Sequence, residues 1–303
     1  MSALTSKLDG TVSTDNTQLP GTCDTFTTNT LNRAWARFIR VNHTGPEPLD
    51  TDLITLSRGS NGAAGYDVHF NLPLIFESCT TYSLNLSFKK DISIEPRSGL
   101  AFKQNLHFME SERIVHYGDM LYIRPRLLCN DKSTLELDDK QAAFQIIFNP
   151  KRDYHRSVIQ GEPSQYPTIR SNSGFGSTDS VTHVNLNELD HYPNNVIYKV
   201  SDDSEFRIQS DLWGLIVVNK STSITIKPRT HYINSLGLTM AMPKNYYYKV
   251  ATIITGLVVM AGIVDADYRG DIKVKLWNDT DEDITIGVHE QFLELIPFTY
   301  EIM

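Results

Sequence analysis

One short stretch carries the side chains expected of an anion clamp. Residues 96–103 read PRSGLAFK and follow a strand-like run. The guanidinium of Arg97, the adjacent hydroxyl of Ser98 and exposed backbone N–H groups together suit a polyphosphate. The alternative is a surface arginine in a turn. The chemistry favoured by this stretch is therefore binding of a phosphorylated ligand.

A carboxylate that suits a metal ion lies upstream of this clamp. Residues 62–68 read GAAGYDV and place Asp67 beside an expected strand. A carboxylate is the kind of hard oxygen donor that Mg²⁺ prefers, directly or through water. The glycines would let the backbone turn sharply under a ligand. Taken alone, however, this stretch is better explained as a structural turn.

A third stretch combines an aromatic ring with hydrogen-bond donors. Residues 170–178 read RSNSGFGST, so that an aromatic face for a base stands among N–H and O–H donors for an anion. The surrounding residues 151–180 contain many Pro, Gly and Ser residues and little apolar periodicity. Composition by itself therefore favours a linker between domains here.

The most apolar stretch of the chain ends in charged residues. Residues 250–264 are rich in β-branched side chains and are interrupted by Gly256 and Gly262, and DADYRG follows at 265–270. The run is shorter than the roughly 20 apolar residues of a membrane-spanning helix. It predicts a buried β-hairpin followed by a polar turn.

Together these stretches resemble the five signature motifs of the dUTPases, enzymes that hydrolyse dUTP to dUMP and pyrophosphate. In motif order they are residues 62–68, 96–103, 255–270, 142–147 and 170–178. Two departures occur. Ala142 stands where the family usually has Arg, and Asp179 stands where it often has Gly.

The resemblance implies a role for each motif residue. Asp265 would be the general base that accepts a proton from the attacking water, because a carboxylate with a reference pKa of about 4 is ionised at neutral pH. Tyr268 would pack against the deoxyribose, and Asp67 would contact Mg²⁺ or its waters. The other substrate-binding residues would be the hairpin residues Gly262 and Ile263, the phosphate-binding residues Arg97, Ser98, Gly99, Gln145, Arg170, Gly176, Ser177 and Thr178, and Phe175, which would stack on uracil.

The two halves of the chain look like diverged copies of one fold. Asp67 is echoed by Asp211, and Gln145 by Glu294, whose carboxylate would repel a triphosphate. The first half keeps motifs one, two and four, but its region 107–123 has no DxDYRG; the second half keeps motif three. This division resembles the double-length monomeric dUTPases of herpesviruses, although there motif three precedes the other four. We therefore expect a monomer with one site for dUTP.

The expected fold is all-β, with two packed dUTPase-like domains of distorted β-barrel or jelly-roll type. The expected segments are a mobile tail (1–32), a first domain (33–155), a linker carrying motif five (156–185) and a second domain (186–303).

Composition restricts the partners and the compartment. The chain has 303 residues and a net charge of -8, which argues against a general nucleic-acid binder. The first twenty residues lack the apolar segment of a secretory signal, and no membrane association is expected. Three widely separated cysteines fit free thiols in a reducing compartment. We expect a soluble intracellular protein, in the host cytoplasm or nucleus if it is viral.

Two other functions remain open at this stage. A non-enzymatic viral interaction protein could keep a dUTPase fold, since fold does not imply function. A dCTP deaminase shares the fold but is disfavoured, because Asp265, Tyr268 and Arg269 follow the dUTPase pattern. The survival of one recognisable copy of each motif favours the dUTP diphosphatase.

Overall fold

The computed structural model describes most of the chain after residue 53. The described residues are 54–70, 74–77, 82–84, 90–108, 114–116, 121–123, 125–128, 134–138, 141–154, 156–172, 190–211 and 214–302. The expected tail at 1–32 and the expected strand at 34–41 lie outside them.

Short β-strands make up most of the described structure, and the expected all-β class is confirmed. Within these residues the only α-helix is α2 (Ser98–Gln104), which lies in the predicted anion clamp. One 3₁₀ turn, η2 (Pro163–Gln165), lies farther along the described part of the chain. In this part of the chain no helix is long and apolar enough to cross a membrane.

The first half, from β1 to β11, is built around a five-stranded antiparallel sheet. Its strand order is β1 (Ile54–Ser57), β2 (Tyr66–Phe70), β11 (Ala142–Phe148), β5 (Ile92–Glu95) and β7 (Ile114–Val115). Three strand pairs complete this half: β3 (Leu74–Glu77) with β10 (Thr134–Leu137), β4 (Tyr82–Leu84) with β8 (Leu121–Ile123), and β6 (Leu106–Phe108) with β9 (Pro125–Leu127).

The second half, from β13 to β25, repeats that plan. Its main sheet has the order β15 (Phe206–Ser210), β16 (Leu215–Asn219), β25 (Gln291–Thr299), β20 (Tyr246–Thr252) and β22 (Ile263–Asp265), and β12 (Lys151–Arg152) adds to β25. The smaller sheets are β13 (Val158–Gln160) with β14 (Val196–Val200) and β19 (Leu238–Ala241); β17 (Ile224–Ile226) with β24 (Ile284–Ile286); and β18 (His231–Ser235) with β23 (Lys273–Asn278) and β21 (Leu257–Val259).

Strand register shows which residues of the two halves are equivalent. Gln145 pairs with Asp67 across β11 and β2, whereas its counterpart Glu294 pairs with Ile216 across β25 and β16. Each pairing follows a β-bulge at the same place, so the counts agree. The expected echo of Asp67 at Asp211 is therefore wrong. The pattern of residue types matched, but Asp211 lies before the equivalent strand, and the second half has replaced the acid with Ile216.

The same comparison locates the first half's counterpart of Asp265. Val115 pairs with Ile92 as Val264 pairs with Tyr248, so the next position is His116 in the first half and Asp265 in the second. Each half has thus lost acids that the other retains.

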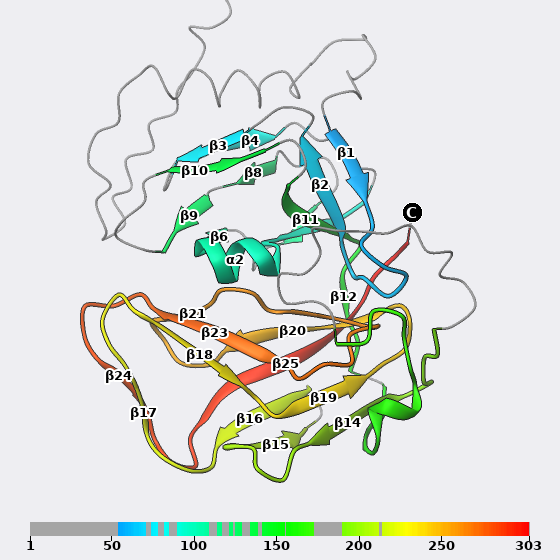
Figure 1. Ribbon diagram of the computed structural model, residues 1–303, viewed down its shortest axis with the longest axis vertical. Coiled ribbons are helices and arrows are strands. Elements are labelled where there is room, and N and C mark those ends of the chain that lie inside the picture. Colours follow the sequence, from blue (N-terminus) through cyan, green and yellow to red (C-terminus); the bar gives the residue numbers. More distant parts are fainter. Residues whose placement is uncertain are drawn as a thin grey trace, which may run out of the picture.

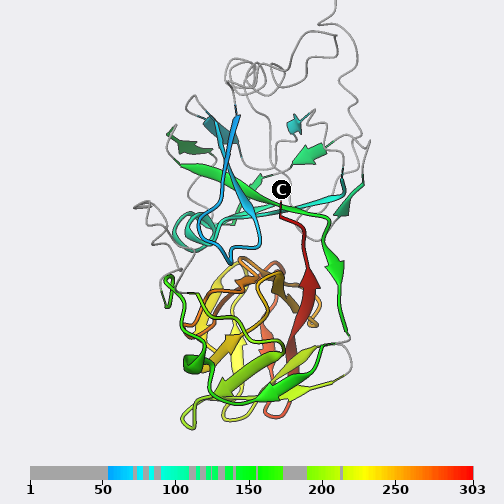
Figure 2. The same cartoon turned by 90° about the vertical axis from the view of Figure 1, so that its right-hand side faces the viewer.

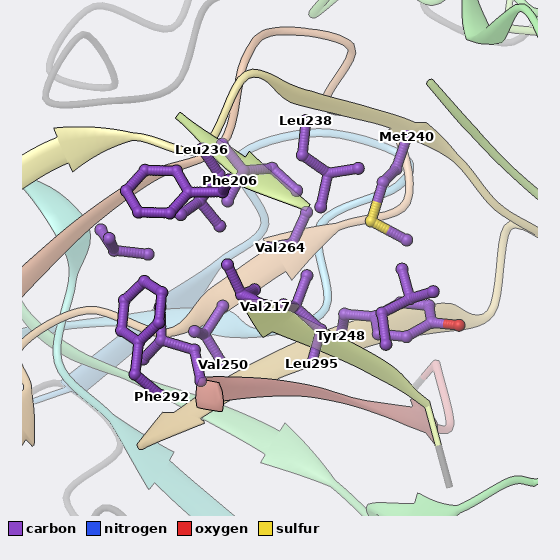
Figure 3. Packing of buried hydrophobic residues seen from close by; sticks show 14 of the residues in the cluster. Phe206, Val217, Leu236, Leu238, Met240, Tyr248, Val250, Val264, Phe292 and Leu295 are labelled. Carbon is purple, nitrogen blue, oxygen red and sulfur yellow. The ribbon is translucent and has the colours of Figure 1, made fainter. Parts of the chain in front are cut away.

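Each half has its own apolar core. The core of the first half includes Val68, Phe76, Phe108 and Phe144. In the core of the second half, side chains from several strands point toward one another between the sheets (Figure 3). Successive side chains of a strand point to opposite faces, so a strand can bury its apolar face in this core.

The two halves pack against each other through two further clusters. The first cluster contains Ala64, Ile147, Tyr247, Ile296, Phe298 and Tyr300. The second contains Ala101, Leu128, Met260 and Trp277. Figure 1 shows the first half above the second, with α2 facing the sheets below it.

Two strands run between the halves. Figure 2 shows the last strand, β25, rising from the second half toward the first, with β12 beside it. Beyond β25, Glu301 donates its backbone N–H to the carbonyl of Phe148 at 3.1 Å. Residues 158–165 of the expected linker pack on the second half, since β13 pairs with β14.

The expected hairpin in the apolar run has a more elaborate form. Strands β20 and β22 pair antiparallel, as predicted. The intervening β21 pairs instead with β23, so part of the run belongs to a different sheet. The chain returns to the main sheet of the second half at Gly262. A glycine is needed there, because a Cβ would lie 2.6 Å from the Val250 carbonyl oxygen.

The interface cluster should contribute much of the protein's stability. Ile147→Ala should lower the free energy of unfolding by about 2–5 kcal/mol, as expected for a large-to-small change at a fully buried site. Urea denaturation followed by tryptophan fluorescence measures the change. The matched control is Ile233→Ala, because Ile233 is 47% exposed; its effect should stay within about 0.5 kcal/mol. Equal effects of the two changes would contradict this account of the interface.

Candidate active site

The carboxylate of Asp265 lies where three separate segments meet. Its Oδ1 accepts a hydrogen bond from the backbone N–H of Ala64 at 2.8 Å. Its Oδ2 accepts one from Nη1 of Arg170 at 2.5 Å. Ala64 belongs to expected motif one, Asp265 to motif three and Arg170 to motif five. Asp265 ends β22, so the sheet of the second half carries it to the first half.

A second acid in the same turn, Asp267, was not among the expected site residues. It is buried, and its Oδ2 accepts a hydrogen bond from the Gly62 backbone N–H at 3.2 Å. Its Oδ1 accepts one from Arg170 at 3.1 Å. Burial raises the pKa of Asp267, the charge of Arg170 opposes this, and nearby Asp265 raises the pKa further. The sequence signal was the spacing of two acids in DADYRG.

Gly62 is required by this acid. A Cβ at Gly62 would lie 2.5 Å from the Cβ of Asp267. Gly62 lies in a turn, as expected, and its lack of a side chain also lets this loop approach Asp267 of the second half. The Ala266 N–H also donates to the Gly62 carbonyl at 3.0 Å, which closes the contact.

Several hydrogen bonds fix the segment that carries Arg170. The backbone N–H of Arg269 donates to the Ser171 carbonyl at 2.7 Å, and its Nε donates to the Tyr166 carbonyl at 2.7 Å. The Thr168 hydroxyl donates to the Asp267 carbonyl at 2.5 Å. Burial lowers the pKa of Arg170, but Asp265 and Asp267 outweigh it and the pKa is raised. The guanidinium is therefore held charged between the two acids.

Asp67 and Arg97 form the first-half side of the site. Arg97 Nε lies 3.0 Å from Asp67 Oδ1, and both side chains are largely buried. Burial raises the pKa of Asp67, and the neighbouring Asp265 also raises it. The charges of Arg97 and Arg170 act in the opposite direction. Asp67, Arg97, Arg170 and Asp265 thus form one electrostatic cluster.

The remaining expected residues surround this cluster. Ser98 and Gly99 begin α2, directly after Arg97. Gln145 lies on β11 between Asp67 and Glu95. Ile263 lies on β22, where it pairs with Lys249.

The ring of Tyr268 covers Gly270. A Cβ at Gly270 would lie 2.5 Å from the Tyr268 hydroxyl, which donates to the Asp271 carbonyl at 2.9 Å. Burial raises the pKa of Tyr268 to about 12, and nearby Asp271 raises it too. The phenol is therefore neutral near pH 7. Phe175, Gly176, Ser177 and Thr178 lie outside the described residues.

The donors of the cluster suit one kind of metal binding. No group of three or more His, Cys, Asp or Glu side chains that could hold a metal ion occurs in the part of the chain described here. Mg²⁺ usually takes one or two protein carboxylates and completes its shell with waters and substrate phosphates. The carboxylate of Asp67, at the edge of the predicted phosphate-binding residues, fits that arrangement.

Part of the chain is similar to known proteins. Residues 217–301 match the family model described as dUTPase. The dUTP nucleotidohydrolase of Yarrowia lipolytica is 32% identical over 77 residues, which cover 24% of this chain and 49% of that protein. The enzyme of Paramecium bursaria Chlorella virus 1 is 33% identical over 67 residues, covering 20% of this chain and 48% of that protein. The chain therefore spans about half the length of these relatives.

Among solved structures, the native EIAV dUTPase is 20% identical and aligns with a TM-score of 0.31 over 36% of this chain and 91% of that one. The resemblance to dUTPases that the motifs predict is confirmed, because residues 217–301 match the dUTPase family model and the curated relatives are dUTP nucleotidohydrolases.

Proposed function

We propose that the protein is a dUTP diphosphatase that converts dUTP to dUMP and pyrophosphate. The observation that carries this proposal is the position of Asp265, which is held by Ala64 of expected motif one and Arg170 of expected motif five. Residues that are far apart in the sequence, and that match separate motifs, therefore meet at the acid predicted to activate water. In the cell, such an activity would keep uracil out of DNA.

The reaction requires Asp265 to accept a proton from a water that attacks the α-phosphorus. One of its oxygens keeps the Ala64 N–H as a fixed donor, which orients the carboxylate. The other oxygen is paired with Arg170. We infer that Arg170 turns toward the substrate phosphates when they enter, because a phosphate competes strongly for a guanidinium. This movement would leave Asp265 Oδ2 to face the water.

The first half would bind the phosphates. Arg97, Ser98 and Gly99 lie together at the start of α2. Gln145 on β11 pairs with Asp67 on the neighbouring strand β2. Mg²⁺, held by Asp67 directly or through water, would neutralise charge on the triphosphate. Positioning and charge neutralisation should supply most of the rate, as in phosphoryl transfer generally.

The second half would bind the nucleoside. Gly262 and Ile263 would present the hairpin backbone to uracil, and Tyr268 would lie against the deoxyribose. The phosphate-binding residues of the first half and the nucleoside-binding residues of the second half would meet where the two halves pack together. In the opposite combination, Ile216 stands at the position of Asp67, and His116 stands at that of Asp265. We therefore infer one site per chain and an active monomer, the arrangement of the double-length herpesvirus enzymes.

The first test concerns the base. Asp265→Asn should lower turnover of dUTP by about 10²–10⁴-fold, the usual contribution of general-base catalysis, while a non-hydrolysable dUTP analogue still binds. Pyrophosphate release with Mg²⁺ across dUTP, dCTP, dTTP and UTP measures activity and selectivity. Asp202→Asn is the control, because Asp202 is an exposed acid outside the site. Nucleotide binding without turnover of any of the four by the unmutated protein would favour the interaction protein instead.

The second test concerns the sugar. The unmutated protein should strongly prefer dUTP over UTP, because the Tyr268 ring would leave no room for a 2′-hydroxyl. Tyr268→Phe retains the ring and should keep this preference, whereas Tyr268→Ala should lose part of it. The ratio of kcat/KM for the two nucleotides measures the effect. Equal rates on dUTP and UTP before mutation would remove Tyr268 from this role.

The third test concerns assembly. Because one chain supplies one copy of each motif, the active species should have a mass near 34.3 kDa. Light scattering on the fraction that carries pyrophosphate-releasing activity measures that mass. Activity confined to a trimeric fraction would contradict the one-chain site.

A further inference from the structure

Lys275 is a charged side chain in the interior of the protein, on strand β23 of the second half. It is 1% exposed. Its neighbour two positions earlier in the strand, Lys273, is exposed. A buried ammonium group requires compensating acceptors, because removing a charge from water is costly. Lys275 finds these acceptors in the first half.

All three acceptors lie at the end of helix α2. The Lys275 ammonium donates to the carbonyls of Ala101 at 3.2 Å and Phe102 at 2.8 Å. It also donates to Oδ1 of Asn105 at 2.5 Å. The last carbonyls of a helix lack partners within the helix, and a lysine can satisfy them. Lys275 thus acts as a cap supplied by the other half of the chain.

The start of the same helix carries the predicted phosphate contacts. Arg97 immediately precedes α2, and Ser98 is its first residue. The helix has 7 residues, so its two ends move together. On the other side of Arg97, Glu95 forms an ion pair with Lys249 at 2.7 Å. The segment from Glu95 to Asn105 is therefore tied to the second half at both ends.

We propose that Lys275 is a positioning residue, which sets the placement of Arg97 and Ser98 relative to Asp265 by capping helix α2 from the second half. The inference depends on the proposed function, because it assigns Arg97 and Ser98 to the substrate phosphates. Lys275 itself would touch neither substrate nor metal. Loss of the Lys275 ammonium should weaken binding of dUTP more than binding of dUMP, because dUMP lacks the β- and γ-phosphates.

Lys275→Met tests this proposal, because methionine is of similar length and has no donor. The kcat/KM for dUTP should fall by up to about 100-fold, the scale expected when a positioned group is misplaced by about 1 Å, with most of the change in KM. Affinity for a non-hydrolysable dUTP analogue, measured by calorimetry, should fall by a similar factor. Affinity for dUMP should change by less than about threefold, since its contacts would come mainly from the second half.

Asn105→Gly is a milder second variant. Asn105 has a φ of 56°, which glycine adopts readily, so the change removes one acceptor of Lys275 without backbone strain. It should shift dUTP and dUMP affinities in the same unequal way, by a smaller factor. Val288→Met, at an exposed position of the second half, is the control and should leave both affinities unchanged.

The outcomes separate the two proposals. If the unmutated protein does not hydrolyse or bind dUTP, the proposed function fails. If it does, and both variants only lower the melting temperature and the active fraction, Lys275 is merely structural and this inference is overturned. An equal loss of dUTP and dUMP affinity would also overturn it, because the effect would not be specific to the phosphates.

Discussion

The ionic contact between Arg170 and the acids Asp265 and Asp267 is the interaction on which the site depends. The two carboxylates lie two residues apart and repel each other; that of Asp267 is buried and that of Asp265 is partly exposed. One guanidinium bridges them, at 2.5 Å and 3.1 Å. Backbone N–H groups of Gly62 and Ala64, from the other half, also donate to these acids. The acids can therefore stay together only while the two halves are docked.

Docking also explains how each half could lose part of the motif set. Once one chain holds both halves in place, a site needs only one complete set of residues. The strand registers show where this relaxation occurred: Ile216 stands in place of Asp67, and His116 in place of Asp265. By the same count from Gln145 and Glu294, Ile253 stands in place of Arg97, and it is 45% exposed. At two of these places, Ile216 and Ile253, an ionic side chain is replaced by an apolar one, which is consistent with a surface that does not bind phosphates.

The sequence correctly predicted the strand content and, through motif three, the resemblance to dUTPases, because both signals are local. A short apolar run that contains aromatic and β-branched residues indicates a buried strand such as β11 (Ala142–Phe148), and DADYRG is contiguous. The internal equivalence of Asp67 was missed because it depends on register and a β-bulge, which residue types alone do not reveal. The Arg170 contact joins residues 95 positions apart. No periodic pattern encodes such a contact; only the common membership of a motif set suggested it.

Lys275 shows a different limit. In KVKLWN the two lysines alternate with apolar residues, and a strand period of two places both on one face, which the pattern assigns to solvent. One of them is buried because α2 lies over that part of the strand. A covering element from another half of the chain thus reverses the meaning of a local pattern, and the reversal is visible only once the halves are packed.

Charge balance constrains how the site can accept a nucleotide. When Asp267 is counted with the electrostatic cluster of Asp67, Arg97, Arg170 and Asp265, three acids face two arginines. A triphosphate that draws Arg170 away would leave Asp265 and Asp267 facing each other without their shared cation. Under the proposed function, the incoming anion would therefore have to bring positive charge with it, and Mg²⁺ held by Asp67 would supply that charge. Arg170 holds the two acids together in this structure, and on the proposed mechanism Asp265 would become able to accept a proton only once another positive charge replaced that of Arg170.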